Sequence, residues 1–224
     1  MTKRAILLFS KPATPGRVKT RLIGPLSAEE AARLHEAFLL DLHDRFAGGP
    51  VELRIFWGLG PDEALPARPG GGRRQEGAEL GERLRRAIEA SADCEQVAVV
   101  GSDHPELSEA SVARAFEALD EGADVVFGPA LDGGYYLVGL RPRALRRELF
   151  EGIPWSTEKV LAASIARAGS LGLDVALLEP GCDVDRPEDL APLAARLRRE
   201  PDLAPRTLAA LARLEPSAFG GRQG

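Results

Sequence analysis

The sequence predicts a single-domain α/β protein, in which a mixed, mostly parallel sheet carries helices on both faces. Segments typical of strands and of helices alternate along the chain, which is the order found in parallel sheets. Two strand-like segments, 97–100 and 125–127, are uninterrupted apolar runs, as expected of strands that are covered on both faces. A chain of 224 residues, of which 44% are hydrophobic, is also long enough to bury one sizeable core.

The same patterns place the individual elements. Strands are expected at 4–10, 51–58, 96–101, 123–129, 134–140 and 173–178, and helices at 28–47, 78–91, 109–120, 143–150, 157–169, 187–199 and 205–214. Ser27 and Glu30 have the spacing of a capping box, which marks the start of the first helix. We interpret His35 and His43 on that helix as surface or packing residues.

The expected domain is 1–200, and residues 201–224 are interpreted as a helical extension and tail that frays from Pro216 onward. The segment 200–215 is open to three interpretations: a terminal helix, a dimerisation arm or a lid. The glycine-rich segment 69–74 is expected to be a lid or a loose loop.

Composition narrows the class of protein. The net charge of −5 gives no support to a nucleic-acid partner. No apolar stretch approaches the length that spans a membrane, and the first strand begins too early to leave room for a signal peptide. Cys94 and Cys182 lack the spacing of a metal site. We therefore expect a reduced, cytoplasmic protein without membrane or nucleic-acid partners.

A basic loop follows the first strand and is the strongest functional signal. It carries Lys11, Arg17, Lys19 and Arg21, and two prolines with Gly16 stiffen it. Because ligands of α/β sheets bind at the carboxyl ends of strands, these cations predict an anionic ligand such as a di- or triphosphate. A solvated surface loop is the alternative. The loop is neither a Walker A motif nor a dinucleotide-binding fingerprint.

Carboxylates follow two further strands. Asp103 ends the strand at 96–101, and Ser108 is better placed than Asp103 to cap the next helix. Asp183 and Asp185 lie on an extended segment, and we expect only one of them to face the same cleft as Asp103. Two carboxylates opposite a basic loop suit Mg²⁺ or Mn²⁺ bound to phosphate oxygens. Helix capping plus surface charge is the alternative for the pair Asp183 and Asp185.

Two loops are candidates for an acceptor site. Asp132, Gly133 and Gly134 read as a hairpin turn whose glycines also let a ligand approach the backbone, beside Tyr135. The second loop places Trp155 next to Ser156 and Thr157, with Ser156 as the expected N-cap of the following helix. A plain turn and a buried Trp155 are the respective alternatives. No Ser-His-Asp signature is visible, which disfavours covalent catalysis.

The order of these motifs resembles the nucleotide-diphospho-sugar transferase superfamily with the GT-A fold. More narrowly, it resembles the bacterial DUF2064 group, also labelled arsenosugar biosynthesis-type glycosyltransferases. The segments that carry the resemblance are 11–22, 75–84, 101–105, 128–137 and 183–190, and together they span residues 4–190. Glu79 stands where the group is expected to have Asp. The Gly-rich start typical of related guanylyltransferases is replaced here by residues 9–12, so side chains would hold the phosphates more than backbone amides.

The resemblance implies a Rossmann-like, GT-A-like domain and a role for each motif. A nucleotide or nucleotide-sugar would be bound by Lys11, Gly16, Lys19, Arg21, Gln75, Gly81 and Ser102, with Gln75 and Gly81 at the base. Asp103 and Asp185 would hold the metal. Lys19 and Arg21 would stabilise charge in the transition state. Asp132 would orient or deprotonate a small acceptor held by Gly133, Gly134, Tyr135, Trp155, Ser156 and Thr157.

Two chemistries fit these expectations. The first, and the one we expect, is glycosyl transfer from a nucleotide-sugar to a small acceptor, which the narrower resemblance favours. The second is nucleotidyl transfer with release of pyrophosphate, which the basic loop favours. A third hypothesis, from another class, is a regulator that binds nucleotide-sugars without catalysis.

Overall fold

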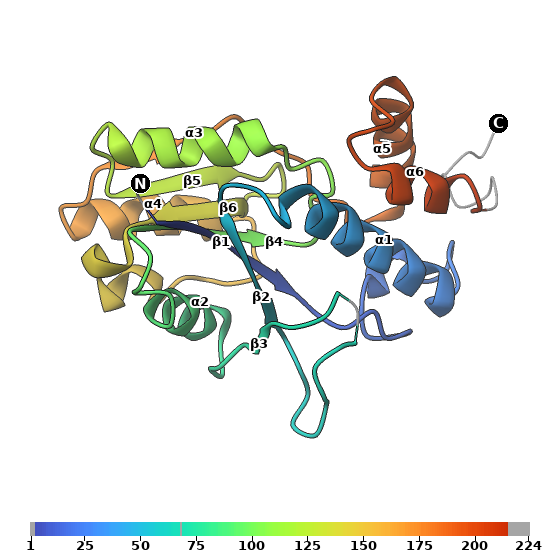
Figure 1. Cartoon of the computed structure of the whole chain (residues 1–224), viewed down its shortest axis with the longest axis horizontal. Coiled ribbons are helices and arrows are strands. Elements are labelled where there is room, and N and C mark those ends of the chain that lie inside the picture. The colour runs from blue at the N-terminus through green and yellow to red at the C-terminus, as the bar shows by residue number, and fades with distance from the viewer. Residues whose placement is uncertain (1–2, 68, 215–224) are drawn as a thin grey trace.

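The computed structural model describes residues 3–67 and 69–214, and one seven-stranded sheet organises them (Figure 1). The strands are β1 (Arg4–Ser10), β2 (Glu52–Trp57), β3 (Arg73–Arg74), β4 (Gln96–Gly101), β5 (Val125–Pro129), β6 (Tyr135–Leu140) and β7 (Val175–Leu177). Their order is β3-β2-β1-β4-β6-β5-β7, and β6 is antiparallel to both of its neighbours while the other pairs are parallel. The sheet confirms the predicted fold class.

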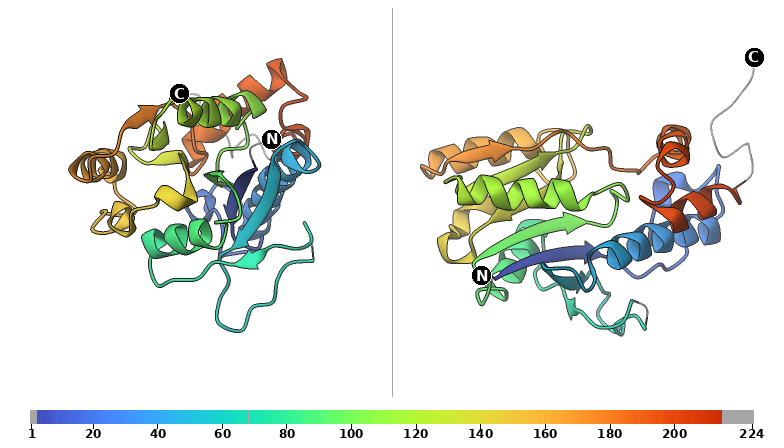
Figure 2. Two further views of the ribbon diagram at one scale, coloured as in Figure 1. Left: turned by 60° about the vertical axis from the view of Figure 1, so that its left-hand side comes forward. Right: turned by 45° about the horizontal axis from the view of Figure 1, so that its top comes forward.

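Helices cover both faces of the sheet (Figures 1 and 2). They are α1 (Ala28–Phe46), α2 (Leu80–Glu89), α3 (Glu109–Asp120), α4 (Val160–Ser170), α5 (Pro187–Arg199) and α6 (Pro205–Leu211). Apolar side chains of α2 and α4 pack on one face, and those of α1 and α3 pack on the other. The alternation of β1 divides its side chains accordingly: Leu7 faces α2, whereas Ile6 and Leu8 face α1.

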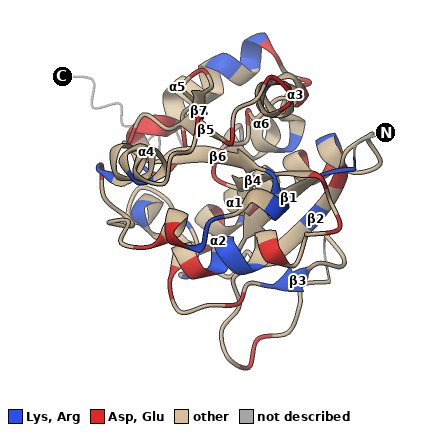
Figure 3. Ribbon diagram, turned by 90° about the vertical axis from the view of Figure 1, so that its left-hand side faces the viewer, with Lys and Arg blue, Asp and Glu red and all other residues tan. Residues whose placement is uncertain are grey.

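Local sequence accounts for most element boundaries. The capping box of Ser27 and Glu30 starts α1, and Ser108 caps α3, both as predicted. Charges of both signs are interleaved along α2, where Arg86 pairs with Glu82 one turn away (Figure 3).

Three details differ from the predicted elements. The expected helix at 143–150 is instead two 3₁₀ turns, Pro142–Ala144 and Arg147–Phe150, because Arg146 is extended between them. Helix α4 begins at Val160 with Lys159, not Ser156, at its N-cap. The short strand β3, which pairs with β2 at the edge of the sheet, was not predicted within the glycine-rich segment.

Helices α5 and α6 pack on the end of α1 and form a third apolar cluster with it. Asp41 of α1 fixes the start of α6 by accepting hydrogen bonds from the backbone N–H groups of Arg206 (3.0 Å) and Thr207 (2.7 Å). The expected frayed tail from Pro216 lies outside the described residues. Within 3–67 and 69–214, no helix is long and apolar enough to cross a membrane.

Candidate active site

The carboxyl ends of β1 and β4, the β5–β6 turn and the segment before α5 surround two adjoining cavities. The first, which we call the β1-side cavity, has a volume of about 680 Å³. The second, the hairpin-side cavity, has a volume of about 1040 Å³. Asp103, Asp183 and Asp185 line both of them, together with Arg21 and Tyr135. The structure thus brings the basic loop, the carboxylates and the acceptor-side loops to one place.

Charge is divided between the two cavities. The β1-side cavity is lined by five cations, Lys11, Arg17, Lys19, Arg21 and Arg83, and by three carboxylates, Asp103, Asp183 and Asp185. The hairpin-side cavity adds Asp132, Glu158, Glu188 and Asp189 to the same three carboxylates, and its only cations within the described chain are Arg21 and Arg186. One cavity is therefore suited to an anionic ligand and the other is not.

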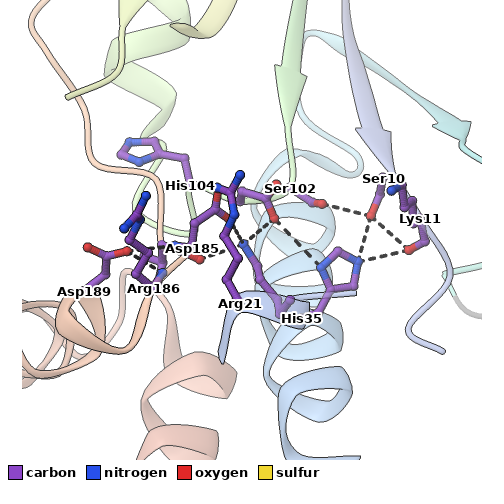
Figure 4. Close-up of polar contacts among 12 residues, drawn as sticks. Ser10, Lys11, Arg21, His35, Ser102, His104, Asp185, Arg186 and Asp189 are labelled. Carbon is purple, nitrogen blue, oxygen red and sulfur yellow. Dashed lines mark hydrogen bonds and ion pairs between the residues drawn. The ribbon is translucent and has the colours of Figure 1, made fainter. Parts of the chain in front are cut away.

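Lys19 joins the basic loop to the carboxylates (Figure 4 shows the neighbouring contacts). Its Nζ lies 2.5 Å from Asp103 Oδ1 and 3.0 Å from Asp185 Oδ1, and it donates to the Val184 carbonyl at 2.7 Å. The side chain is only 2% exposed, and its backbone is left-handed with φ of 47°. Burial opposes the charge, but the two carboxylates outweigh it and raise the pKa of Lys19. Lys19 is thus a charged clamp between two loops.

Asp183 and Asp185 both lie in the segment before α5. The sequence predicted that only one of them faces the cleft of Asp103. That expectation was wrong, because residues two apart in an extended chain share a face. Val184 between them turns into the core of α1, α5 and α6. Burial, and then the charges of Asp103 and Asp132, raise the pKa of Asp183 to about 7.

His35 is buried and lines the β1-side cavity. The sequence alone predicted only that it is a surface or packing residue. Nε2–H donates to the Lys11 carbonyl at 3.0 Å, which leaves Nδ1 as an acceptor 4.0 Å from Asp103 Oδ1 (Figure 4). Burial lowers the pKa of His35, which favours the neutral ring. The sequence did carry a signal, since His35, Leu39, Leu42 and Phe46 form one helical stripe that faces the sheet.

His104 connects the loop of Asp103 to the segment of Asp183. Its Nδ1–H donates to the Cys182 carbonyl at 2.7 Å, and its ring lies 4.8 Å from the ring of Tyr136. Tyr136 in turn donates to the Glu179 carbonyl at 3.1 Å. A β-carbon at Gly181 would lie 2.8 Å from Tyr136 and 3.0 Å from His104, so only glycine fits there. His104 therefore positions the carboxylate segment.

We expect His104→Leu to lower kcat by about tenfold, because one hydrogen bond of about 1 kcal/mol fixes the segment and its loss misplaces the carboxylates. His104→Asn should restore most of the activity, since its amide N–H can donate to the same carbonyl. Steady-state kinetics of both variants check this. Equal loss in both would show that the ring stack, and not the hydrogen bond, holds the segment.

The turn between β5 and β6 shapes the hairpin-side cavity. Asp132 Oδ1 accepts from the backbone N–H of Gly134 at 2.9 Å, and Gly133 adopts φ of 89°. A β-carbon at Gly133 would lie 2.1 Å from the Glu158 carbonyl oxygen, so the turn packs directly on the loop of Trp155. The Leu161 N–H bond to the Gly133 carbonyl (2.9 Å) fixes that contact. The hairpin confirms the predicted turn.

The structure places the other candidate residues as follows. The β1-side cavity is lined by Lys11, Lys19, Arg21, Gln75 and Ser102, and the hairpin-side cavity by Arg21, Asp132, Gly134, Tyr135, Trp155, Ser156 and Thr157. Gly16, Gly81 and Gly133 line neither cavity. Gly81 packs against the Phe150 carbonyl and Trp155, where a β-carbon would lie 2.4 Å from the carbonyl oxygen. Arg83 lines the β1-side cavity and was not singled out from the sequence.

The donor set fits a hard divalent cation. Asp103, Asp183 and Asp185 offer carboxylate oxygens on the shared wall, and Mg²⁺ needs only one or two protein carboxylates. Burial, and then the charges of Asp103 and Asp132, raise the pKa of Asp183, and a bound cation would offset those charges. Over the described ranges, Glu52, Asp93 and Cys94 form the only trio of close potential ligands, but Arg54 already binds Asp93 at 2.7 Å.

Comparison with known proteins places the whole chain among nucleotide-transferring enzymes. A family model described as "Uncharacterized protein conserved in bacteria (DUF2064)" matches residues 62–157. The 3-phospho-D-glycerate guanylyltransferase of Phenylobacterium zucineum (strain HLK1) is 32% identical over 192 residues, which cover 79% of this chain and 84% of the relative. A crystal structure from Desulfovibrio desulfuricans G20, assigned as a nucleotide-diphospho-sugar transferase, is 30% identical, with a TM-score of 0.90 over 98% of both chains.

A more distant structure shares the fold alone. The 2-C-methyl-D-erythritol 4-phosphate cytidylyltransferase of Thermus thermophilus is 21% identical with a TM-score of 0.54, over 87% of this chain and 98% of the other. The fold and the relatives define a transferase of the nucleotide-diphospho-sugar class. The chain belongs to that superfamily and, within it, to the DUF2064 family.

Proposed function

We propose that the protein is a metal-dependent nucleotidyltransferase that moves a nucleotide from a nucleoside triphosphate to a hydroxyl group of a small acceptor. The observation that carries this proposal is the division of charge between the joined cavities. Lys11, Arg17, Arg21 and Arg83 around the β1-side cavity suit a triphosphate, which carries more charge than the diphosphate of a nucleotide-sugar. The guanylyltransferase relative supports the same choice.

In the proposed reaction, the acceptor oxygen forms a bond to the α-phosphorus, and the bond to the β-phosphate breaks. Pyrophosphate leaves with the electron pair, and Asp132, which lines the hairpin-side cavity, is the candidate to take the acceptor proton. Lys11, Arg17, Arg21 and Arg83 neutralise the phosphates. Asp103, with Asp183 or Asp185, would hold Mg²⁺, which supplies charge stabilisation at the phosphate oxygens. Lys19 keeps Asp103 and Asp185 in place.

Glycosyl transfer is the second candidate, because the D. desulfuricans structure is assigned as a nucleotide-diphospho-sugar transferase and matches over almost the whole chain. Product analysis separates the two chemistries. Labelled nucleoside triphosphates and nucleotide-sugars are incubated with the full-length protein, Mg²⁺ and hydroxyl acceptors. Pyrophosphate from a triphosphate supports our first proposal, whereas a nucleoside diphosphate from a nucleotide-sugar replaces it by the second. If nucleotides bind but neither product forms, both proposals fail.

Lys11→Ala is expected to weaken nucleotide binding by about tenfold, because a charge-assisted contact contributes roughly 1.5–3 kcal/mol. In the chain that the structure describes, Lys11 has no ion-pair partner, so its charge is available to a phosphate. Isothermal titration with Mg²⁺ and the nucleotide measures the change. Arg86→Ala is the matched control, since Arg86 is exposed and lines neither cavity. Equal affinities of the two variants would show that the basic loop is a solvated surface loop and does not bind the phosphates.

A further inference from the structure

We propose that His35 is a positioning residue that makes Ser102 a hydrogen-bond donor to a phosphate of the bound nucleotide. The two residues are joined through Ser10, and we call the three side chains together the His35 network. This inference rests on the proposed function, in which the β1-side cavity holds the triphosphate. It adds a neutral donor to the cations that line this cavity.

The His35 network joins helix α1 to the ends of two neighbouring strands (Figure 4). Ser10 is the last residue of β1, and Ser102 follows β4 directly. The backbone N–H of Ser102 donates to the Phe9 carbonyl at 3.1 Å, which holds the two strand ends together. All three members of the network line the β1-side cavity and are buried in its wall. Bulk water therefore does not compete for the hydrogen bonds between them.

The direction of these hydrogen bonds is fixed at His35. A carbonyl oxygen can only accept, so the contact of 3.0 Å between His35 Nε2 and the Lys11 carbonyl requires a hydrogen on Nε2. Ser10 Oγ lies 3.3 Å from the same Nε2 and accepts from it as well. Among the described residues Nδ1 has no hydrogen-bond partner. Nε2 is therefore the atom through which His35 acts on the serines.

Ser10 passes this direction on to Ser102. Ser10 Oγ donates to Ser102 Oγ at 2.9 Å. Within 3–67 and 69–214, no protein group accepts the hydroxyl hydrogen of Ser102 in turn. That hydrogen is available to a ligand in the β1-side cavity. The oxygens of an ionised phosphate only accept hydrogen bonds, so a phosphate is the kind of group that this donor binds.

Without His35, the two serines can take the opposite direction. Ser10 Oγ also lies 3.3 Å from the Lys11 carbonyl, to which it can donate. Once Ser10 donates there, Ser102 donates to Ser10 Oγ, and no hydrogen is left for the ligand. In the native protein His35 already supplies a donor to the Lys11 carbonyl, and this keeps the Ser10 hydroxyl turned toward Ser102.

Nucleotide affinity of the full-length protein tests this inference. ATP, GTP, CTP and UTP are titrated calorimetrically with Mg²⁺, and the one that binds most tightly is the probe. Ser102→Ala and His35→Leu are each expected to weaken its binding by about tenfold, because each removes the same charge-assisted hydrogen bond. His35→Gln should restore most of the affinity, since its amide N–H can donate to the Lys11 carbonyl. His43→Leu, on the same helix but outside both cavities, is the matched control.

Two double variants separate this positioning role from a structural one. In a Ser102→Ala protein, the further change His35→Leu should cost no more affinity, because the donor is already absent. In a His35→Leu protein, the further change Ser10→Ala should restore most of the affinity, because the Ser102 hydrogen then has no serine to turn to. Additive losses in the first pair, or no recovery in the second, overturn the inference.

If His35→Leu does not fold, His35→Asn replaces it in these measurements, because its shorter amide does not reach the Lys11 carbonyl. Long-range ¹H–¹⁵N NMR of the wild type is an independent check. A neutral His35 ring with its hydrogen on Nε2 supports the inference, and one with its hydrogen on Nδ1 overturns it.

The same titrations separate this inference from the proposed function. A protein that binds none of the four triphosphates with Mg²⁺ refutes the proposed function itself. A protein that binds one of them equally well with and without the Ser102 hydroxyl refutes the role of the His35 network alone.

Discussion

Asparagine in place of Asp103 is expected to lower turnover by about a thousandfold and to abolish the Mg²⁺-dependent part of nucleotide binding. Asp103 lies at the end of β4, on the wall that the two cavities share. A bound metal contributes several kcal/mol to the stabilisation of transition-state charge, and each ~1.4 kcal/mol is a factor of ten in rate. Asparagine keeps the shape of the side chain, which is 45% exposed, so the fold should survive.

Titration calorimetry of a nucleotide with and without Mg²⁺ measures this prediction, and a melting curve checks the fold. Asp93→Asn is the matched control, since Asp93 belongs to the other group of potential ligands, Glu52, Asp93 and Cys94. Arg54 and Lys3 already pair with Asp93 there. If the metal dependence disappears in Asp93→Asn and persists in Asp103→Asn, the metal site is at that other group.

The strands could be predicted because a strand that is buried on both faces has an uninterrupted run of apolar residues. β4 and β5 are apolar runs, and they lie inside a sheet whose two faces are covered by helices. β3 has no apolar run: it consists of two arginines at the sheet edge, which pair with β2 through their backbone. Backbone pairing of that kind depends on tertiary context and not on residue type.

The site could be located from strand ends, but its internal pairing could not. Position after a strand predicted that the basic loop lies opposite Asp103, and the structure places Lys19 Nζ 2.5 Å from Asp103 Oδ1. The left-handed backbone at Lys19, which turns its side chain inward, follows no local rule for a lysine. The contact between Lys19 and Asp185 joins segments 166 residues apart, so only the folded chain reveals that this cation is shared by two carboxylates.

Methionine in place of Lys19 is expected to lower the free energy of unfolding by about 2–3 kcal/mol and to reduce activity strongly. Removing one partner of a buried ion pair costs about 3–5 kcal/mol, and we expect less here because solvent reaches both carboxylates. Asp103 and Asp185 are 45% and 36% exposed, whereas Lys19 is 2% exposed. Chemical denaturation with EDTA present measures the change without a contribution from metal.

The pH dependence of stability shows whether the loss in Lys19→Met comes from the ion pair with Asp103. Burial alone would raise the pKa of Asp103, but the charge of Lys19 outweighs burial and lowers it. A carboxyl whose pKa is lowered by folding stabilises the protein above its unfolded pKa of about 4, and this contribution is lost as the pH falls through the lowered value. The stability difference between wild type and Lys19→Met should therefore be full at pH 7 and should shrink below about pH 4.

A double-mutant cycle with Asp103→Asn completes the test. If Lys19 acts by holding Asp103, the summed stability losses of the two single variants should exceed the loss in the double variant, since the second substitution removes a pair that is already broken. Lys19 also contacts Asp185 and the Val184 carbonyl, so part of its effect should remain in the double variant. Strict additivity, together with a stability difference that does not change with pH, would show that Lys19 acts through its packing on Phe38, whose ring centroid is 5.4 Å away, and not through the carboxylates.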